Sequence, residues 1–241
     1  MLTVTNVSMN FSGQPLFKDV DLKFTPGNCY GIIGANGAGK STTMNIITGY
    51  LAATSGEVKI NGFDVLKQPE EAKKCVGYLP ELPPLYMDMT VKEYLDFVAE
   101  LKKLEKSLRA GYVKEAMKIT KTEEVSGRLI RNLSKGYRQR VGFAQAVLGY
   151  PEILILDEPT DHLDMESITA LNNGLIKFPG VILFASRDHQ VVQTTANRII
   201  EFLPDGTFVD KVSSYDEYLE NDEMARKRQV YSMSDDDASD N

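Results

Sequence analysis

Alternating apolar and polar residues dominate the first part of the chain, and this period of two is typical of half-buried β-strands. Residues 2–9 and 16–24 both follow the alternation. The segment CYGIIG (29–34) is apolar throughout and runs into glycine, which predicts a short buried strand. Residues 56–66 alternate around Asn61-Gly62, which predicts a β-hairpin with a tight turn.

The middle of the chain changes to the spacing of amphipathic helices. Apolar residues recur three or four positions apart at Val91, Leu95, Val98, Leu101 and Leu104. Further helices are expected over 110–119 and 135–148. We therefore expect residues 85–150 to form a helical subdomain inserted into an α/β core, with its many lysines on a solvated face.

The last third alternates between strand and helix patterns, which predicts a parallel sheet and the α/β fold class. Strands are expected at 152–156, 181–185 and 198–202, helices at 166–178 and 189–196, a turn at Pro204–Gly206, and a charged helix over 214–230. The prediction is a single domain over 1–230, followed by an acidic disordered tail at 231–241.

Charge and composition exclude several classes of protein. The net charge is −7, and the aspartates at 235–237 and 240 contribute four of these charges, so the body has no basic field for nucleic acid. The two cysteines, Cys29 and Cys75, are too few for a disulfide scaffold and predict reduced thiols. No apolar run reaches the 18 to 20 residues of a membrane span, and residues 1–12 show no signal-peptide core. We expect a cytoplasmic protein that would reach the inner face of a membrane only through partner subunits.

The strongest chemical signal is GANGAGKS at residues 34–41, which has the pattern G-x-x-x-x-G-K-[ST] between a strand and a helix. The glycines let the backbone approach an anion closely, and the N–H groups of the loop and of the helix N-terminus bind phosphate oxygens. Lys40 adds a point charge, and Ser41 offers a hydroxyl to Mg²⁺. The predicted nucleotide contacts are Gly34, Asn36, Gly37, Ala38, Gly39, Lys40, Ser41 and Thr42.

A second motif, ILILDEP at 153–159, places two acids at the carboxyl end of a buried strand. Open α/β sheets bind ligands at that edge. Asp157 is predicted to hold Mg²⁺ through its water shell, and Glu158 to act as the general base on the attacking water.

With these motifs in place, the chain resembles the ATP-binding cassette (ABC) family over almost its whole length. Residues 133–137, LSKGY, stand where that family has its LSGGQ-like signature, 20 residues before ILILDEP. Lys135 and Tyr137 depart from the pattern, whereas Ser134 and Gly136 match it. The resemblance implies that this segment of one subunit caps the ATP of the other, and that the fold is a P-loop NTPase of ABC type with an N-terminal antiparallel β subdomain and an inserted helical subdomain.

Single residues follow from the same resemblance. Phe11 matches the aromatic that stacks on adenine, and Asp164 matches the loop that crosses the dimer interface. Glu81 stands where many members have glutamine, as a further candidate ligand of Mg²⁺ or water. Arg187 replaces the family's histidine at the γ-phosphate, while His189 is expected to be a surface or packing residue. Arg187 either slows hydrolysis or acts as a charge clamp.

The resemblance is mixed along the chain. Residues 1–43 and about 157–230 look like soluble F-type ABC ATPases that act on ribosomes, whereas 44–150 look like transporter ATPase subunits. The sequence therefore suggests a mosaic, natural or engineered.

The leading prediction is an ATP-hydrolysing transporter subunit that dimerises head to tail with a second copy or a related cassette and docks on membrane-spanning subunits. The groove beside Glu81, walled by 80–89, would receive a short helix of the membrane protein. One alternative is a translation-type factor acting on the ribosome, although the tail is acidic where ribosomal RNA favours bases. The other is a nucleotide-binding module with impaired hydrolysis.

Overall fold

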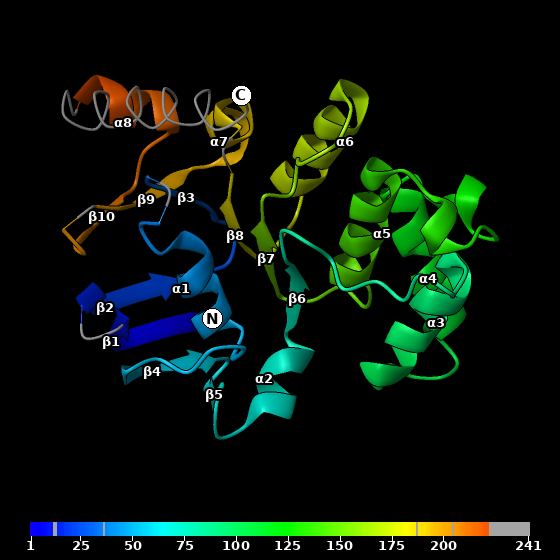
Figure 1. Ribbon diagram of the computed structural model, residues 1–241, viewed down its shortest axis with the longest axis horizontal. Helices are drawn as coiled ribbons and strands as arrows, with labels where there is room; N and C mark the ends of the chain where they lie inside the picture. Colours follow the sequence, from blue (N-terminus) through cyan, green and yellow to red (C-terminus); the bar gives the residue numbers. More distant parts are fainter. Residues whose placement is uncertain (12–13, 36, 187, 204, 222–241) are drawn as a thin grey trace.

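In the computed structural model, the described residues are 1–11, 14–35, 37–186, 188–203 and 205–221. Two β-sheets pack against each other, and a helical region lies to one side of them (Figure 1). The smaller sheet is antiparallel in the order β2-β1-β4-β5. Its strands are β1 (Leu2–Phe11), β2 (Gln14–Phe24), β4 (Ser55–Ile60) and β5 (Phe63–Asp64).

The larger sheet has six strands in the order β10-β9-β3-β8-β7-β6 and is parallel except for the edge strand β10. Its strands are β3 (Cys29–Ile33), β6 (Val76–Leu79), β7 (Ile153–Asp157), β8 (Val181–Ala185), β9 (Arg198–Phe202) and β10 (Phe208–Lys211). Because β3, β7 and β8 are buried along their whole length, they read as continuous apolar runs in the sequence.

The strand pleat divides the apolar residues between the two faces of the six-stranded sheet. Ile153 and Ile155 of β7 pack toward the small sheet and α1 (Lys40–Ile47), whereas Leu154 and Leu156 pack toward the opposite layer. That layer contains α6 (Met165–Ile176), α7 (His189–Thr195) and α8 (Tyr215–Asn221). The sheet is therefore covered on both faces, and the carboxyl ends of β3 and β7 lie on the same edge.

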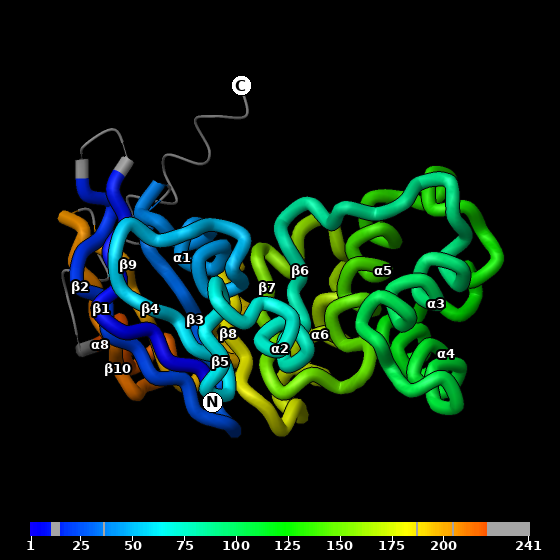
Figure 2. The backbone as a smooth tube through the Cα atoms, turned by 90° about the horizontal axis from the view of Figure 1, so that it is seen from below, coloured from blue at the N-terminus to red at the C-terminus, as the bar shows by residue number. Residues whose placement is uncertain are grey.

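The helices α3 (Val91–Leu101), α4 (Arg109–Ile119) and α5 (Lys135–Val147) lie to one side of the sheets (Figure 2). A hydrophobic cluster joins these three helices. Thr90 and Glu93 form a reciprocal capping box that starts α3. Two short 3₁₀ turns, Glu123–Val125 and Ile130–Asn132, connect α4 to α5.

Most predicted elements are confirmed, and the differences have local causes. The hairpin turn is present, with Asn61 and Gly62 both at positive φ. Leu104 is not part of the helix predicted from its spacing, because Lys103 takes a left-handed conformation after α3; Leu104 instead packs back on the helical cluster, and Leu101 is exposed.

Other differences concern short elements and the carboxyl terminus. The helix α2 (Pro69–Lys74) and the strand β10 were not predicted. Of the predicted helix over 214–230, only α8 falls within the described residues, and the tail at 231–241 and Pro204 lie outside them. No helix in the described ranges is long and apolar enough to cross a bilayer. The two cysteines are free thiols.

Candidate functional site

The glycine-rich loop joins β3 directly to α1 at the carboxyl edge of the large sheet. Gly34, Gly37 and Gly39 have φ values of 141°, 80° and 101°, which side chains disfavour. At Gly34 the space is closed as well, because a Cβ atom there would lie 2.6 Å from the carbonyl oxygen of Phe202. The loop therefore requires glycine both for its backbone angles and for its close approach to β9.

The first turn of α1 presents its backbone N–H groups toward the loop. Gly39 occupies the N-cap position, where no side chain caps the helix. Lys40 folds back over the loop, where its ammonium donates a hydrogen bond to the Gly34 carbonyl oxygen. Ala38 precedes this turn and Thr42 lies within it, whereas Asn36 lies outside the described residues. Uncapped amides together with a lysine ammonium form a binding site for an anion.

Two oxygen-bearing side chains meet between α1 and β7. The Ser41 hydroxyl donates a hydrogen bond to Asp157 Oδ1 over 3.2 Å, and Asp157 is only 4% exposed. The pair connects positions 116 residues apart in the sequence. A hydroxyl and a carboxylate at one point are hard oxygen donors of the kind Mg²⁺ prefers, so the donor set fits that ion. The described residues contain no cluster of three or more His, Cys, Asp or Glu side chains that could hold a metal ion without other ligands.

Glu158 follows Asp157 and has a left-handed backbone, with φ at 46°. Non-glycine residues rarely adopt this region, so surrounding contacts must hold it. Its N–H donates to the Ala185 carbonyl oxygen over 2.9 Å, and its own carbonyl oxygen accepts from Gln139 Nε2 over 3.2 Å. Glu158 is 6% exposed, so β8 and α5 fix it at the edge of the sheet.

Sequence reasoning missed Gln139, a buried polar residue on α5 that contacts Glu158. The available signal was an amide side chain on a helix face that packs against the core. It also missed Tyr78 of β6, whose hydroxyl donates to Asn45 Oδ1 of α1 over 3.1 Å. Burial, with the Asp157 carboxylate and Tyr50 nearby, raises the pKa of Tyr78 to about 12. The Tyr78 hydroxyl therefore stays protonated and links β6 to the helix that carries Ser41.

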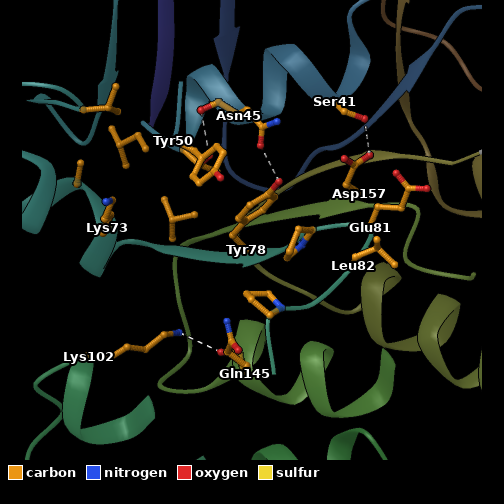
Figure 3. Close-up of a pocket in the computed structure, with 17 residues that line it drawn as sticks. Ser41, Asn45, Tyr50, Lys73, Tyr78, Glu81, Leu82, Lys102, Gln145 and Asp157 are labelled. Carbon is orange, nitrogen blue, oxygen red and sulfur yellow. Dashed lines mark hydrogen bonds between the residues drawn. The ribbon is translucent and has the colours of Figure 1, made fainter. Parts of the chain in front are cut away.

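A cavity of about 660 Å³ opens beside the Ser41–Asp157 pair (Figure 3). Glu81, in the loop after β6, lies at the same end of the cavity as this pair, and its role as a further oxygen ligand stays a prediction. Lys102 and Gln145 line the other end. Ser134 and Gly136 do not line this cavity.

The segment 133–137, here called the signature turn, starts α5. Ser134 is its N-cap and accepts a hydrogen bond from the Tyr137 N–H over 3.3 Å, while its side chain remains exposed. Gly136 approaches the next loop so closely that a Cβ atom would lie 2.7 Å from the His162 carbonyl oxygen. The matching serine is thus exposed at the helix end, whereas the matching glycine is half-buried against the loop that contains His162.

Asp164 makes its contacts within its own chain. It caps α6, accepting from the Ser167 N–H over 2.8 Å, and it pairs with Arg140 of α5 over 3.1 Å. These Ser167 hydrogen bonds are the main reason that the pKa of Asp164 is lowered. The Arg140 guanidinium also lies 5.0 Å from the centre of the Tyr137 ring, and the Tyr137 hydroxyl bonds to Glu124. Tyr137, which replaces the family's glutamine, therefore joins the signature turn to the loop before α6.

Three predicted contacts cannot be placed in this geometry. Arg187, like Asn36, lies outside the described residues, and of Phe11 only the backbone at the end of β1 is described. His189 is half-buried against Tyr215, to which its ring is hydrogen-bonded, and burial lowers the pKa of His189. This fits the packing role predicted for His189.

The loop at 34–41, the helix N-terminus behind it and the acidic pair at the end of β7 define a phosphate-loop nucleotide-binding protein. A sequence model described as ABC transporter matches residues 17–161, which is more than half of the chain. The chain therefore belongs to the ABC transporter family and has the fold of its ATP-binding cassettes.

Relatives agree with this assignment. An ABC transporter ATP-binding protein of Bacillus subtilis strain 168, YkpA, is 32% identical over 94% of this chain and 46% of its own length. The bacitracin transport ATP-binding protein BcrA of Bacillus licheniformis is 31% identical over 77% of this chain and 61% of its own length. The chain thus spans about half to three-fifths of the length of these relatives.

Solved structures share the fold. One, described as the ATP-binding subunit of an ABC transporter, has a TM-score of 0.82 at 26% identity and covers 92% of both chains. The dimeric bacterial ABC transporter cassette MJ0796 has a TM-score of 0.76 at 23% identity, covering 87% of this chain and 98% of its own, and supports the fold alone.

Proposed function

We propose that this chain binds ATP with Mg²⁺ and hydrolyses it to drive a membrane transporter. The observation that carries the proposal is the contact between Ser41 and Asp157, which joins the phosphate loop to the acidic edge of the sheet. A glycine-rich turn without this function would not be expected to bring the buried Asp157 carboxylate and the Ser41 hydroxyl close to Lys40 and to uncapped backbone amides. Family membership supports the same chemistry.

The roles of the residues follow from their positions. The amides of 37–42 and the Lys40 ammonium bind the phosphates, with Asn36 completing the predicted loop contacts. Ser41 and Asp157, with Glu81 at the same end of the cavity, would hold Mg²⁺, and the bound ion would offset charge on the phosphate oxygens. Glu158 accepts the proton of the attacking water, and its pinned backbone keeps that carboxylate at the sheet edge. Phe11 is proposed to stack on the adenine.

A head-to-tail dimer would complete the site. Ser134 is exposed at the N-terminus of α5 with Gly136 half-buried beside it, and neither residue lines the cavity of its own chain. An exposed helix N-terminus binds anions, so this turn would reach the phosphates held by a second copy or a related cassette. The loop that ends at Asp164 would lie along the same interface. The likeness to a dimeric cassette supports this arrangement at the level of the fold.

The membrane partner is proposed from the cavity and the relatives. BcrA is named for bacitracin transport. In this chain, Pro80, Leu82 and Pro84 line the cavity beside Glu81, and Leu82 exposes a large apolar side chain there. Such a surface suits a short helix of a transporter subunit, which would hold the cassette at the membrane.

Gel filtration and turnover assays with the Glu158→Gln variant test this function. With ATP, we expect the variant to bind nucleotide, to lose turnover and to elute as a dimer, because binding remains while water activation is lost. The parent should turn over ATP only with Mg²⁺ present. A variant that stays monomeric at saturating ATP contradicts the dimer, and a parent that neither binds nor hydrolyses ATP contradicts the whole proposal.

A further inference from the structure

Lys102 occupies the end of the cavity opposite the Ser41–Asp157 pair (Figure 3). It follows the last residue of α3, and its ammonium donates to the carbonyl oxygens of Gln145 and Leu148 over 3.2 and 3.0 Å. These two carbonyls belong to the C-terminal end of α5, where a cation is favoured by the helix dipole. Burial lowers the pKa of Lys102 to about 8, because the ammonium has lost much of its hydration.

Two lysines near Lys102 in the sequence or in space form ion pairs with carboxylates, and Lys102 itself does not among the described residues. Lys74 pairs with Glu71 over 2.9 Å, and Lys103 pairs with Glu70 over 2.8 Å. Within the part of the chain that the structure describes, Lys102 has only carbonyl partners, and Lys73, which also lines the cavity, is in no ion pair. The two lysines therefore leave positive charge on the side of the cavity away from the Ser41–Asp157 pair.

The walls between these ends are apolar and open to solvent. Tyr50, after α1, is 84% exposed, and Leu82, in the loop after β6, is 80% exposed. Exposed side chains of this size at a cavity mark a surface for a partner. The lysines also set an orientation, since an anionic side chain of a docked segment is attracted to the Lys102 end of the cavity.

We propose that Lys102 determines the specificity of this cavity, and that the transporter segment docking there is amphipathic and presents a carboxylate to the Lys102 ammonium. The inference rests on the membrane partner of the proposed function and adds the chemistry by which that partner is recognised. Apolar side chains of the segment pack on Tyr50 and Leu82, and its carboxylate supplies the charged partner that Lys102 lacks among the described residues.

The test uses peptides as probes of the segment. Twelve-residue peptides are selected from a display library against the full chain with MgATP, and clones that require Leu82 are kept by counter-screening on Leu82→Ser. Because Leu82 is exposed, that substitution leaves the fold intact. Clone affinities are then measured on the parent, on Lys102→Met, and on Lys74→Met as a control for loss of a lysine outside the cavity.

We expect the retained clones to contain Asp or Glu and to bind Lys102→Met about tenfold or more weakly, as expected for a lost charged hydrogen bond, with Lys74→Met unchanged. Replacing the clone's acid by its amide should weaken binding to the parent but add nothing on Lys102→Met, as in a double-mutant cycle. Clones that lack acids, or that bind Lys102→Met as tightly as the parent, overturn the inference. So does a library without any Leu82-dependent clone.

Two further measurements separate the competing explanations. If Lys102 only caps α5, Lys102→Met lowers the unfolding temperature while clone affinities stay the same, and the inference fails. ATP binding and turnover are measured on the same proteins. A parent protein that neither binds nor hydrolyses ATP would contradict the proposed function. A parent protein that does both, with peptide clones that show no preference for a carboxylate, would contradict only the role of Lys102.

Discussion

The carboxyl edge of the large sheet and the N-terminal end of α5 each carry a sequence motif of the ABC family. The two regions differ in how far contacts within the chain hold their polar side chains. At the sheet edge, Lys40, Ser41, Asp157 and Glu158 are all held by contacts within the chain, and the two acids are buried. At the signature turn, Ser134 is exposed, and its described hydrogen bond serves to start its own helix. A buried polar group must find its partners in the fold, whereas an exposed one is available to a second molecule. The sheet edge is therefore complete within one chain, whereas the signature turn is available for contact with a second chain.

The largest expected effect breaks the sheet edge. Lys40→Ala should weaken ATP binding by about 2–5 kcal/mol, roughly 30-fold to several thousand-fold, because a desolvated phosphate loses its charge partner. Lys135→Ala, in the exposed signature turn, is the matched control and should leave the ATP affinity of the monomer unchanged. Titration calorimetry on both variants checks this. Equal affinity of Lys40→Ala and the parent would remove the basis for the nucleotide site.

A second effect concerns Arg187, whose surroundings are not part of the described structure. The family's histidine would offer a compact donor to the γ-phosphate, whereas arginine is longer and permanently charged. We expect slow hydrolysis with retained ATP binding, and a gain in turnover for Arg187→His. Loss of one well-placed donor costs on the order of 10²–10³ in rate at comparable sites. If Arg187→His is no faster than the parent at equal nucleotide affinity, the interpretation that Arg187 slows hydrolysis is wrong and the charge clamp is favoured.

The third effect sharpens the separation between the two regions. Ser134→Ala in the Glu158→Gln background should abolish the ATP-dependent dimer while leaving the ATP affinity of the monomer unchanged. The same change removes a helix cap, which costs about 1 kcal/mol of stability. Ser134→Asp, which keeps a cap but adds negative charge, should also prevent dimerisation. Sedimentation with ATP measures both, and a Ser134→Ala protein that still dimerises contradicts the role of the signature turn in a partner's site.

The smallest effect concerns Asp164, which joins the two regions through Arg140 and Ser167. Because its pKa is lowered in the folded protein, the carboxylate stabilises the fold above its unfolded pKa, and the stabilisation disappears as pH falls through the lowered value. Asp164→Ala should reduce the unfolding temperature slightly at pH 7, and the difference from the parent should shrink at pH 3. Asp164→Asn retains a capping group and should lose less. A difference that is the same at both pH values would show that the charge of Asp164 contributes nothing.

The domain limits and the mosaic remain predictions. The helices of 91–147 share one hydrophobic cluster, which is consistent with an inserted subdomain. Hydrogen exchange or limited proteolysis would test whether the helical cluster folds separately, in which case its residues should open together and independently of the six-stranded sheet.

The sequence by itself determined the parts of this protein that depend on neighbours along the chain. Glycine spacing and the apolar run before it specify the loop at 34–41, and four apolar residues before Asp157 specify β7, because these elements form from local backbone preference and burial. The hairpin at Asn61-Gly62 follows for the same reason.

Only the tertiary structure decided which distant side chains meet. The sequence around Gln139 does not predict the hydrogen bond from its side chain to the Glu158 backbone. Tyr78 reaches Asn45 only because β6 lies beside the strand that ends at Asp157. Lys102 looked like one lysine among many on a solvated face, yet the packing of α3 on α5 brings its ammonium to the cavity. Such contacts depend on strand order and helix packing, which bring together residues tens of positions apart. Local sequence patterns therefore cannot predict them.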